Sequence, residues 1–338
     1  MRIGFNPNKD TLNDDSEYFH QIIVPVYIPN EEDYFKDSLL ILKNCLNSLF
    51  ITSHSKTYFT VVNNGSCTSV IKYLNKLLKE NIIQELIHTT NIGKLNAILK
   101  GVVGQKFKFV TITDADVLFL NNWQIATYDV FRNFKKAGVV CTTPSPKSFN
   151  DKTFNILFEN MFSKKLRFTK VKNPKALSDF ALSIENPDFY KKCHLKNNLT
   201  IINGKYKAVV GAGHFVATYR FDVFKFLDKS YSNYRLGGDS ESTILDLPII
   251  KKGLWRLSTE NNYTNHMGNV IEPWMSEIIN KQVDLSDHVF DYKFEDIRES
   301  KLGFWLKNIF FARLFNQRKV RQLFLRYKGL SKKDSIDY

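Results

Sequence analysis

The sequence predicts an α/β protein with a mostly parallel sheet flanked by helices and a helical extension at the C-terminus. Short β-branched apolar runs alternate with stretches of helical periodicity across the first 120 residues. Most of these runs are apolar throughout rather than alternating, as is typical of strands buried on both faces. The length of 338 residues is enough for one large α/β domain with additions.

The expected elements follow one another regularly in the first half of the chain. In chain order they are a strand over 21–27, a helix over 33–50, a strand over 58–62, a helix over 68–80, a strand over 82–88, a helix over 95–103 and a strand over 107–113. The second half is less regular. It predicts helices over 155–165, 221–229 and 240–252, and a short strand over 254–257.

Polar clusters follow three of the predicted strands. They are Asn63–Ser66, Asn91–Lys94 and the triplet Asp114-Ala115-Asp116. Parallel sheets bind ligands at the carboxyl ends of their strands, so these clusters should meet at one ligand site.

The triplet Asp114-Ala115-Asp116 suggests a metal site. Two carboxylates one residue apart at the end of a buried strand are costly unless a positive charge meets them. Mg²⁺ and Mn²⁺ take oxygen ligands and leave positions for phosphate and water. The same pattern also occurs by chance or as a helix cap, so the strand-end position is what favours a metal that grips a nucleoside diphosphate.

The net charge of +14 is concentrated near the C-terminus. Residues 301–333 carry ten Lys or Arg and no acid, interleaved with apolar residues that include Phe304, Trp305, Ile309, Phe310, Leu314 and Phe315. This pattern predicts basic amphipathic helices, which either contact an anionic membrane or pack back on the preceding domain. Nucleic acid is not expected as a partner, because no recognised binding module accompanies the charge.

Targeting signals are not apparent. We find no run of about 18 apolar residues, and the first 20 residues lack the apolar stretch of a signal peptide. The four cysteines are far apart, with no C-x-x-C pair, which argues against a zinc cluster or a disulfide framework. We therefore expect a cytoplasmic location, with membrane contact, if any, peripheral and at the inner face of the cell membrane.

Over about residues 20–270 the chain resembles a family 2 glycosyltransferase with the GT-A fold. Val24-Pro25-Val26-Tyr27 is similar to the family's opening strand, Asn91-Ile92-Gly93-Lys94 to its Asn-x-Gly segment, and Asp114-Ala115-Asp116 to its metal triplet. Asn63 stands where the family usually has an acid that holds uracil, and an amide can still bond a uracil edge.

The resemblance implies roles for individual residues. Asp116, with Asp114 and His266, would bind Mn²⁺ or Mg²⁺. Residues contacting the nucleotide-sugar would be Pro25, Tyr27, Asn63, Asn91, Gly93, Lys94 and Asp114. The segment Gly238–Glu241 resembles the family's acidic motif, which makes Asp239 the expected catalytic base and Glu241 the reserve. Asp239 is also placed to cap the helix expected after it.

The same resemblance implies an organisation and an activity. Residues 1–270 would form the catalytic domain, with a nucleotide-sugar-binding half over about 20–125 and an acceptor-binding half over 126–270. Residues 271–338 would be the basic helical extension. The activity would be inverting transfer of a sugar from a donor, UDP-linked by preference, to a hydroxyl of a saccharide or lipid-linked acceptor in surface polysaccharide biosynthesis.

Three other functions are considered. A nucleotidyltransferase should carry a Gly-rich loop with Lys or Arg after the first strand, which Pro25–Asn30 lacks. A non-catalytic protein that binds the membrane surface would also account for the basic C-terminal segment. A dehydrogenase is suggested by the stretch Gly211–Ala217, which resembles a dinucleotide-binding turn. The strand with an acid at its end that should follow such a turn is missing.

Overall fold

The computed structural model describes residues 4–6, 9–11, 16–227, 230–238, 240–283 and 292–338. The strands are β1 His20–Val26, β2 Thr57–Asn64, β3 Glu85–Thr89, β4 Phe109–Thr113, β5 Val117–Phe119, β6 Ala137–Cys141, β7 Leu166–Lys170, β8 Asn197–Asn203, β9 Tyr206–Val210, β10 Val216–Arg220, β11 Trp255–Thr259 and β12 Thr264–His266.

The α-helices are α1 Ser38–Thr52, α2 Thr68–Lys79, α3 Lys94–Val102, α4 Trp123–Asn133, α5 Phe154–Glu159, α6 Pro174–Ser183, α7 Lys192–Lys196, α8 Leu247–Lys251, α9 Pro273–Ile279, α10 Lys301–Trp305, α11 Phe311–Phe315, α12 Arg318–Tyr327 and α13 Asp334–Asp337. Three 3₁₀ turns, η1 Asp33–Phe35, η2 Pro146–Asn150 and η3 Phe221–Phe226, and two π-helical stretches, η4 Ser242–Asp246 and η5 Leu306–Phe310, complete the described elements.

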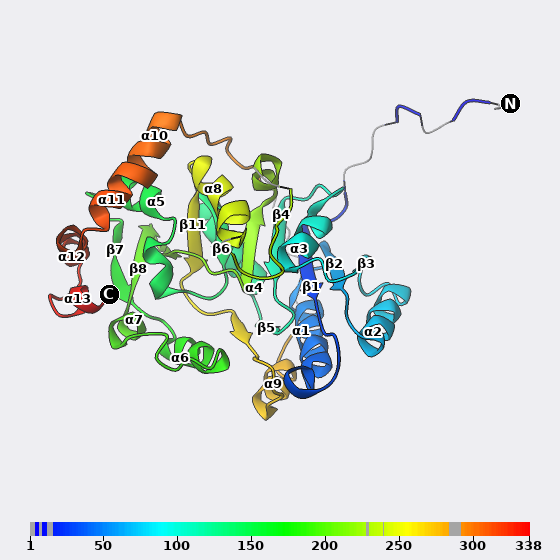
Figure 1. The fold of residues 1–338 in the computed structure, drawn as a ribbon. Helices are drawn as coiled ribbons and strands as arrows, with labels where there is room; N and C mark the ends of the chain where they lie inside the picture. Colours follow the sequence, from blue (N-terminus) through cyan, green and yellow to red (C-terminus); the bar gives the residue numbers. More distant parts are fainter. Residues whose placement is uncertain (1–3, 7–8, 12–15, 228–229, 239, 284–291) are drawn as a thin grey trace.

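A ten-stranded sheet forms the centre of the molecule, in the order β3-β2-β1-β4-β10-β6-β11-β9-β8-β7 (Figure 1). The first four strands are parallel and are joined through α1, α2 and α3. β10 enters antiparallel between β4 and β6, and β9 and β7 also run against the majority direction. The predicted α/β class with a mostly parallel sheet flanked by helices is confirmed.

Helices cover both faces of the parallel strands because successive side chains of β1 point to opposite sides. The Gln21 amide donates to the carbonyl of Gly101 in α3 at 2.7 Å. On the other face, the His20 imidazole lies 2.6 Å from the hydroxyl of Tyr128 in α4. Burial and the nearby His54 lower the pKa of His20 well below its usual value, so the buried ring is neutral at pH 7.

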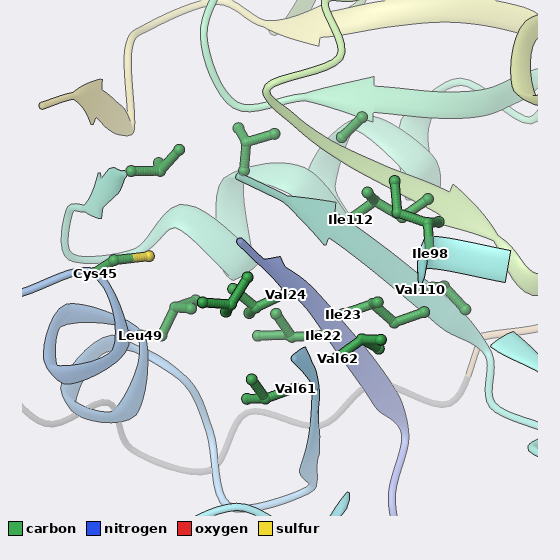
Figure 2. Packing of buried hydrophobic residues seen from close by; sticks show 14 of the residues in the cluster. Ile22, Ile23, Val24, Cys45, Leu49, Val61, Val62, Ile98, Val110 and Ile112 are labelled. Carbon is green, nitrogen blue, oxygen red and sulfur yellow. The ribbon is translucent and has the colours of Figure 1, made fainter. Parts of the chain in front are cut away.

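The main hydrophobic core lies around β1, as the sequence pattern predicts. Ile22, Ile23 and Val24 are fully buried between the side chains of β2, β4, α1 and α3 (Figure 2). Since β1 carries apolar residues on both faces, it has no side turned to solvent. This rigid centre fixes the positions of the neighbouring strand ends.

The second half adds an antiparallel region that the sequence pattern did not predict in detail. The helix expected over 155–165 ends at Glu159, and Leu166 begins β7, which pairs with β8. The helix expected over 221–229 is a 3₁₀ turn, and β2 continues through Asn64, where a turn was expected. Phe311 and Phe315 of the C-terminal helices are buried in a second core with residues of β8 and β9. Within the described ranges, no helix has both the length and the apolarity needed to cross a bilayer.

Candidate active site

The site lies where β1, β2, β3 and β4 end and β10 begins. Asp114 directly follows β4, and its backbone N–H donates to the Phe215 carbonyl at 2.8 Å. Because β10 runs antiparallel to β4, with Val216 opposite Thr113, the residues before β10 lie at the same edge as those after β4. This arrangement brings His214 beside the Asp114-Ala115-Asp116 triplet.

Lys94 joins two of the predicted acids. Its ammonium lies 2.6 Å from Asp114 Oδ1 and 3.4 Å from Glu241 Oε1. Burial by itself would lower the pKa of Lys94, but these two carboxylates hold it above its usual value. Lys94 is therefore charged, and it compensates both acids.

Close backbone packing explains how Glu241 reaches Lys94. The Lys94 N–H donates to the Arg235 carbonyl at 2.9 Å. Gly93 has a φ of +91°, and a Cβ there would lie 2.8 Å from Arg235 Cα, so glycine is required by both the conformation and the space. The Asn96 side chain exchanges two hydrogen bonds with the backbone of Ser232. These contacts hold the segment before Glu241 against the start of α3.

A second set of charges lies behind Glu241. His214 Nε2 is 2.9 Å from Asp246 Oδ2, and the same oxygen is 3.2 Å from the guanidinium of Arg256, which is fully buried. Since a carboxylate only accepts, Nε2 of His214 carries a proton and Nδ1 points toward Glu241, 3.8 Å from Oε2. We call Lys94, Asp114, Glu241, His214, Asp246 and Arg256 the Lys94 cluster.

Asp116 faces the other way and meets His266. β12 pairs with β5 so that His266 lies opposite Val117, the residue after Asp116. His266 Nε2 is 3.4 Å from Asp116 Oδ2, and its Nδ1 lies 3.0 Å from the Ser183 hydroxyl and 3.3 Å from the Gly268 N–H. We call Asp116 and His266 the His266 pair.

The His266 pair has the features of a cation site. Asp116 Oδ1 is buried and makes no hydrogen bond to any described residue, and burial raises the pKa of this carboxyl. The Gly268 N–H donates to His266 Nδ1, which places the ring proton on Nε2, facing Asp116 Oδ2. A cation would bind Nε2 in the other tautomer, in which Nδ1 donates to the Ser183 hydroxyl. No group of three or more His, Cys, Asp or Glu converges on a metal position among the described residues. The pair therefore suits a metal that takes its other ligands from phosphate and water.

The two predicted aspartates differ in how well they suit a metal ion. Asp114 is occupied by Lys94, whereas Asp116 has an unused carboxylate oxygen. Asp116 and His266 are consequently the residues that would hold Mn²⁺ or Mg²⁺, and Asp114 would contribute after release from Lys94.

The other residues predicted to bind the donor lie at the same edge of the sheet. They differ in exposure and in whether their polar groups already have hydrogen-bond partners. Tyr27 is exposed after β1, and Pro25 is partly buried within it. The buried Asn63 accepts from the Ser66 N–H at 3.0 Å and lies 2.9 Å from His88 Nδ1, so both ends of its amide have partners. Asn91 accepts from the Gly93 N–H and orders the turn before Lys94.

The expected base has no described position, and three residues that the sequence pattern did not indicate lie in the site. Asp239, the expected base, lies outside the described residues. His214, Asp246 and Arg256 were not identified from the sequence as site residues. The available signal was a polar His just before the strand-like segment 215–219, which should begin at the ligand edge if that strand is antiparallel.

A cavity of about 490 Å³ opens beside the His266 pair. Its walls come from α6, β12 and α9, and they include Phe180, Ser183, Asn265 and Trp274. An aromatic ring with amide and hydroxyl groups suits a ligand that has both apolar faces and hydroxyls.

The solved structures to which this chain is similar include glycosyltransferases. S. aureus TarS 1–349 in complex with UDP-GlcNAc is 13% identical, with a TM-score of 0.42, 94% of this chain covered and 69% of that chain. A mannosyltransferase from Pyrobaculum calidifontis in complex with GDP-Man and Mn²⁺ is 13% identical, with a TM-score of 0.42, 94% of this chain covered and 76% of that chain. Against another structure of TarS 1–349, the match spans 60% of the TarS chain. No protein-family model and no curated protein matches the sequence. Similarity this low leaves the function to be argued from the chain's own residues.

Proposed function

We propose that this chain is a metal-dependent glycosyltransferase of family 2 type that uses a nucleotide-sugar donor. The observation that carries the proposal is the contact of Asp116 with His266, 150 positions later in the chain. One buried oxygen of the Asp116 carboxylate has no hydrogen-bond partner within the described part of the chain. Asp116 lies near the positively charged Lys94, which contacts Asp114. Both acids follow the carboxyl end of a parallel strand, where α/β sheets bind nucleotides.

Each half of the site has a role in this proposal. Residues of about 20–125 bind the donor, and residues of 126–270 bind the acceptor. A Mn²⁺ or Mg²⁺ ion held by Asp116 and His266 would offset the charge of the diphosphate leaving group. The Lys94 ammonium adds a second positive charge near the same group when it turns from Asp114 toward phosphate.

The transfer step requires a base on the acceptor side. The acceptor hydroxyl oxygen forms a bond to the anomeric carbon, while the bond from that carbon to the diphosphate oxygen breaks and its electron pair leaves with the nucleotide. The hydroxyl proton passes to a carboxylate, for which we propose Asp239, with Glu241 as the reserve. Attack opposite the leaving group inverts the anomeric centre.

The identity of the substrates forms the finer part of the proposal. We propose UDP as the donor nucleotide, with Asn63 reaching the uracil edge only after its amide exchanges the His88 contact for the base. The acceptor would be a saccharide or lipid-linked acceptor in surface polysaccharide biosynthesis. The enzyme would then work in the cytoplasm at the inner face of the cell membrane, with residues 271–338 as a basic extension of the catalytic domain.

Thermal-shift titration with UDP- and GDP-sugars, with and without Mn²⁺, tests the proposal. A donor that binds only the folded state raises the unfolding temperature in proportion to affinity and concentration. We expect a rise with a UDP-sugar that depends on Mn²⁺, is absent from Asp116→Ala, and is kept by Asp129→Ala, a change on the exposed side of α4. Full sugar transfer by Asp116→Ala would contradict the metal assignment, and normal turnover by Asp239→Asn would exclude Asp239 as the base.

A further inference from the structure

The C-terminal helices contact the body of the protein with one side only. Residues 301–315 form a continuous helical run through α10, η5 and α11. Phe311 and Phe315 on its inner side are buried in the second core, and Phe315 stacks edge-on against Phe324 of α12. These helices lie at the end of the molecule that carries β7 and β8 (Figure 1). Phe311 and Phe315 therefore pack back on the preceding domain, which is one of the two roles expected for residues 301–333.

The outer side of the same run is apolar. Leu302, Trp305, Ile309, Phe310 and Leu314 are exposed, with Leu302 74% and Trp305 46% exposed. At about 100° per residue these positions fall within about half of the helix circumference. Arg313 is the charged residue within that arc. A helix on a water-facing surface normally shows the reverse pattern, with charged residues outward.

α12 repeats the pattern. Val320, Leu323 and Tyr327 recur at i, i+3 and i+7, which places them on one stripe, and Leu323 is 68% exposed. α12 contacts α11, so the two exposed stripes belong to one helical unit. We call the eight exposed apolar residues of this unit the C-terminal face: Leu302, Trp305, Ile309, Phe310, Leu314, Val320, Leu323 and Tyr327.

The charge around the C-terminal face is entirely positive within residues 301–333. Lys307 is paired with Glu159 at 2.7 Å, and the Lys328 ammonium donates to the carbonyls of Asn160 and Ser163. Burial lowers the pKa of Lys328 to about 8. These two lysines hold the helices to the body, while the other exposed basic residues of the unit face water: Lys301, Arg313, Arg318, Lys319, Arg326, Lys332 and Lys333.

We propose that the C-terminal face docks on the surface of a bilayer that contains anionic lipids, with α10, α11 and α12 lying in the interface. Apolar side chains enter the boundary between headgroups and acyl chains, and the surrounding Lys and Arg meet lipid phosphates. Trp305 and Tyr327 have the amphipathic rings that are enriched at this depth. A second copy of the chain is a poorer occupant, because it would bring the same positive charges against one another.

Vesicle flotation of the full chain tests the proposal independently of sugar transfer. Vesicles of phosphatidylcholine alone are compared with vesicles containing about one third phosphatidylglycerol. We expect the wild-type protein to float with the anionic vesicles and to be released by high salt, because surface attraction is screened within about 10 Å at 0.1 M salt.

Two variants separate the apolar and the electrostatic contributions. Leu302→Gln with Leu323→Gln removes the most exposed apolar contacts, and Arg318→Glu with Lys319→Glu reverses two charges. Each should weaken vesicle binding by about tenfold or more. All four positions are exposed, so folding should be unaffected, which circular dichroism and the unfolding temperature would check. The matched control is Lys100→Glu with Val103→Gln at the exposed end of α3, which should bind like wild type.

Three outcomes would overturn the proposal: wild-type protein that floats with neither vesicle, face variants that bind as tightly as wild type, or a control that loses binding equally. Light scattering on the free protein provides a further arm. A wild-type dimer converted to a monomer by the Leu302→Gln and Leu323→Gln changes would assign the face to a second copy instead. Loss of vesicle binding with unchanged donor binding would leave the proposed activity intact.

Discussion

The two sides of the Asp114-Ala115-Asp116 triplet solve the cost of buried charge in different ways. In the Lys94 cluster, the carboxylates of Asp114 and Glu241 are met by Lys94, and that of Asp246 by Arg256. In the His266 pair, Asp116 keeps a buried oxygen with no hydrogen-bond partner among the described residues. The protein itself compensates the first set of charges, and we propose that a bound cation compensates the second. Under this proposal, two acids one residue apart contribute separately to stability and to ligand binding.

Removing the charge of Asp116 should have the largest effect on activity. If the proposed metal site is correct, Asp116→Asn should lower the rate of transfer by roughly 10²–10³-fold, because the charge that would hold the metal on the leaving group is lost. The unfolding temperature without metal should stay about the same, because Asp116 Oδ1 has no hydrogen-bond partner to lose among the described residues and the side chain is partly exposed. Steady-state kinetics and calorimetry would measure both. Asp129→Asn is the control, and a large loss of stability in Asp116→Asn would contradict the comparison.

Removing a paired carboxylate from the Lys94 cluster should instead reduce the stability of the protein. Asp246→Asn should lower the free energy of unfolding by about 2–4 kcal/mol, because the buried Arg256 loses its buried carboxylate partner. Urea unfolding measures this change. The double variant Asp246→Asn with Arg256→Met should lose less than the sum of the two single changes. A loss within error of zero in Asp246→Asn would mean that Asp151, the other carboxylate near Arg256, is sufficient.

Lys94 links the two sides, so its removal should affect both measurements moderately. Lys94→Met leaves Asp114 and Glu241 facing each other without a cation and should cost about 1–2 kcal/mol of stability, since all three side chains are partly exposed. Nucleotide affinity should also fall. Lys94→Arg should restore most of the stability. If Lys94→Met binds the donor as tightly as wild type, Lys94 has no part in donor binding.

The smallest effect is expected for Ser183, whose hydroxyl contacts His266. Ser183→Ala removes a hydroxyl 3.0 Å from His266 Nδ1 and should weaken Mn²⁺ binding about tenfold by freeing the ring orientation. Titration of Mn²⁺ in the presence of a nucleotide would measure this. Donor binding without metal should be unchanged. Ser178→Ala, on the same helix but bonded to the Pro174 carbonyl, is the matched control. Equal Mn²⁺ affinity in both variants would exclude a role for Ser183.

Much of the first half of the fold was predictable because its signals are local. Apolar runs bounded by polar clusters identified β1, β2 and β4, and the end of β4 was predicted at Thr113. The meander of β7, β8 and β9 was not predicted, because these strands carry mixed polar and apolar residues such as Leu166–Lys170. The C-terminal helices were predicted as amphipathic, yet which aromatics face inward depends on the surface they meet, as Phe315 and Trp305 illustrate.

Local sequence patterns were sufficient to predict the parallel strands and the position of Asp114 and Asp116 at a strand end, because side-chain periodicity and strand length are properties of short segments. The distant residues that contact these acids became known only from the three-dimensional arrangement of the strands. Antiparallel insertion of β10 beside β4 brought His214 to the edge, packing of the 230–238 segment on Gly93 delivered Glu241, and pairing of β12 with β5 placed His266 next to Asp116. These contacts join residues more than 90 positions apart, through two strand pairings and one loop contact, which no local pattern encodes.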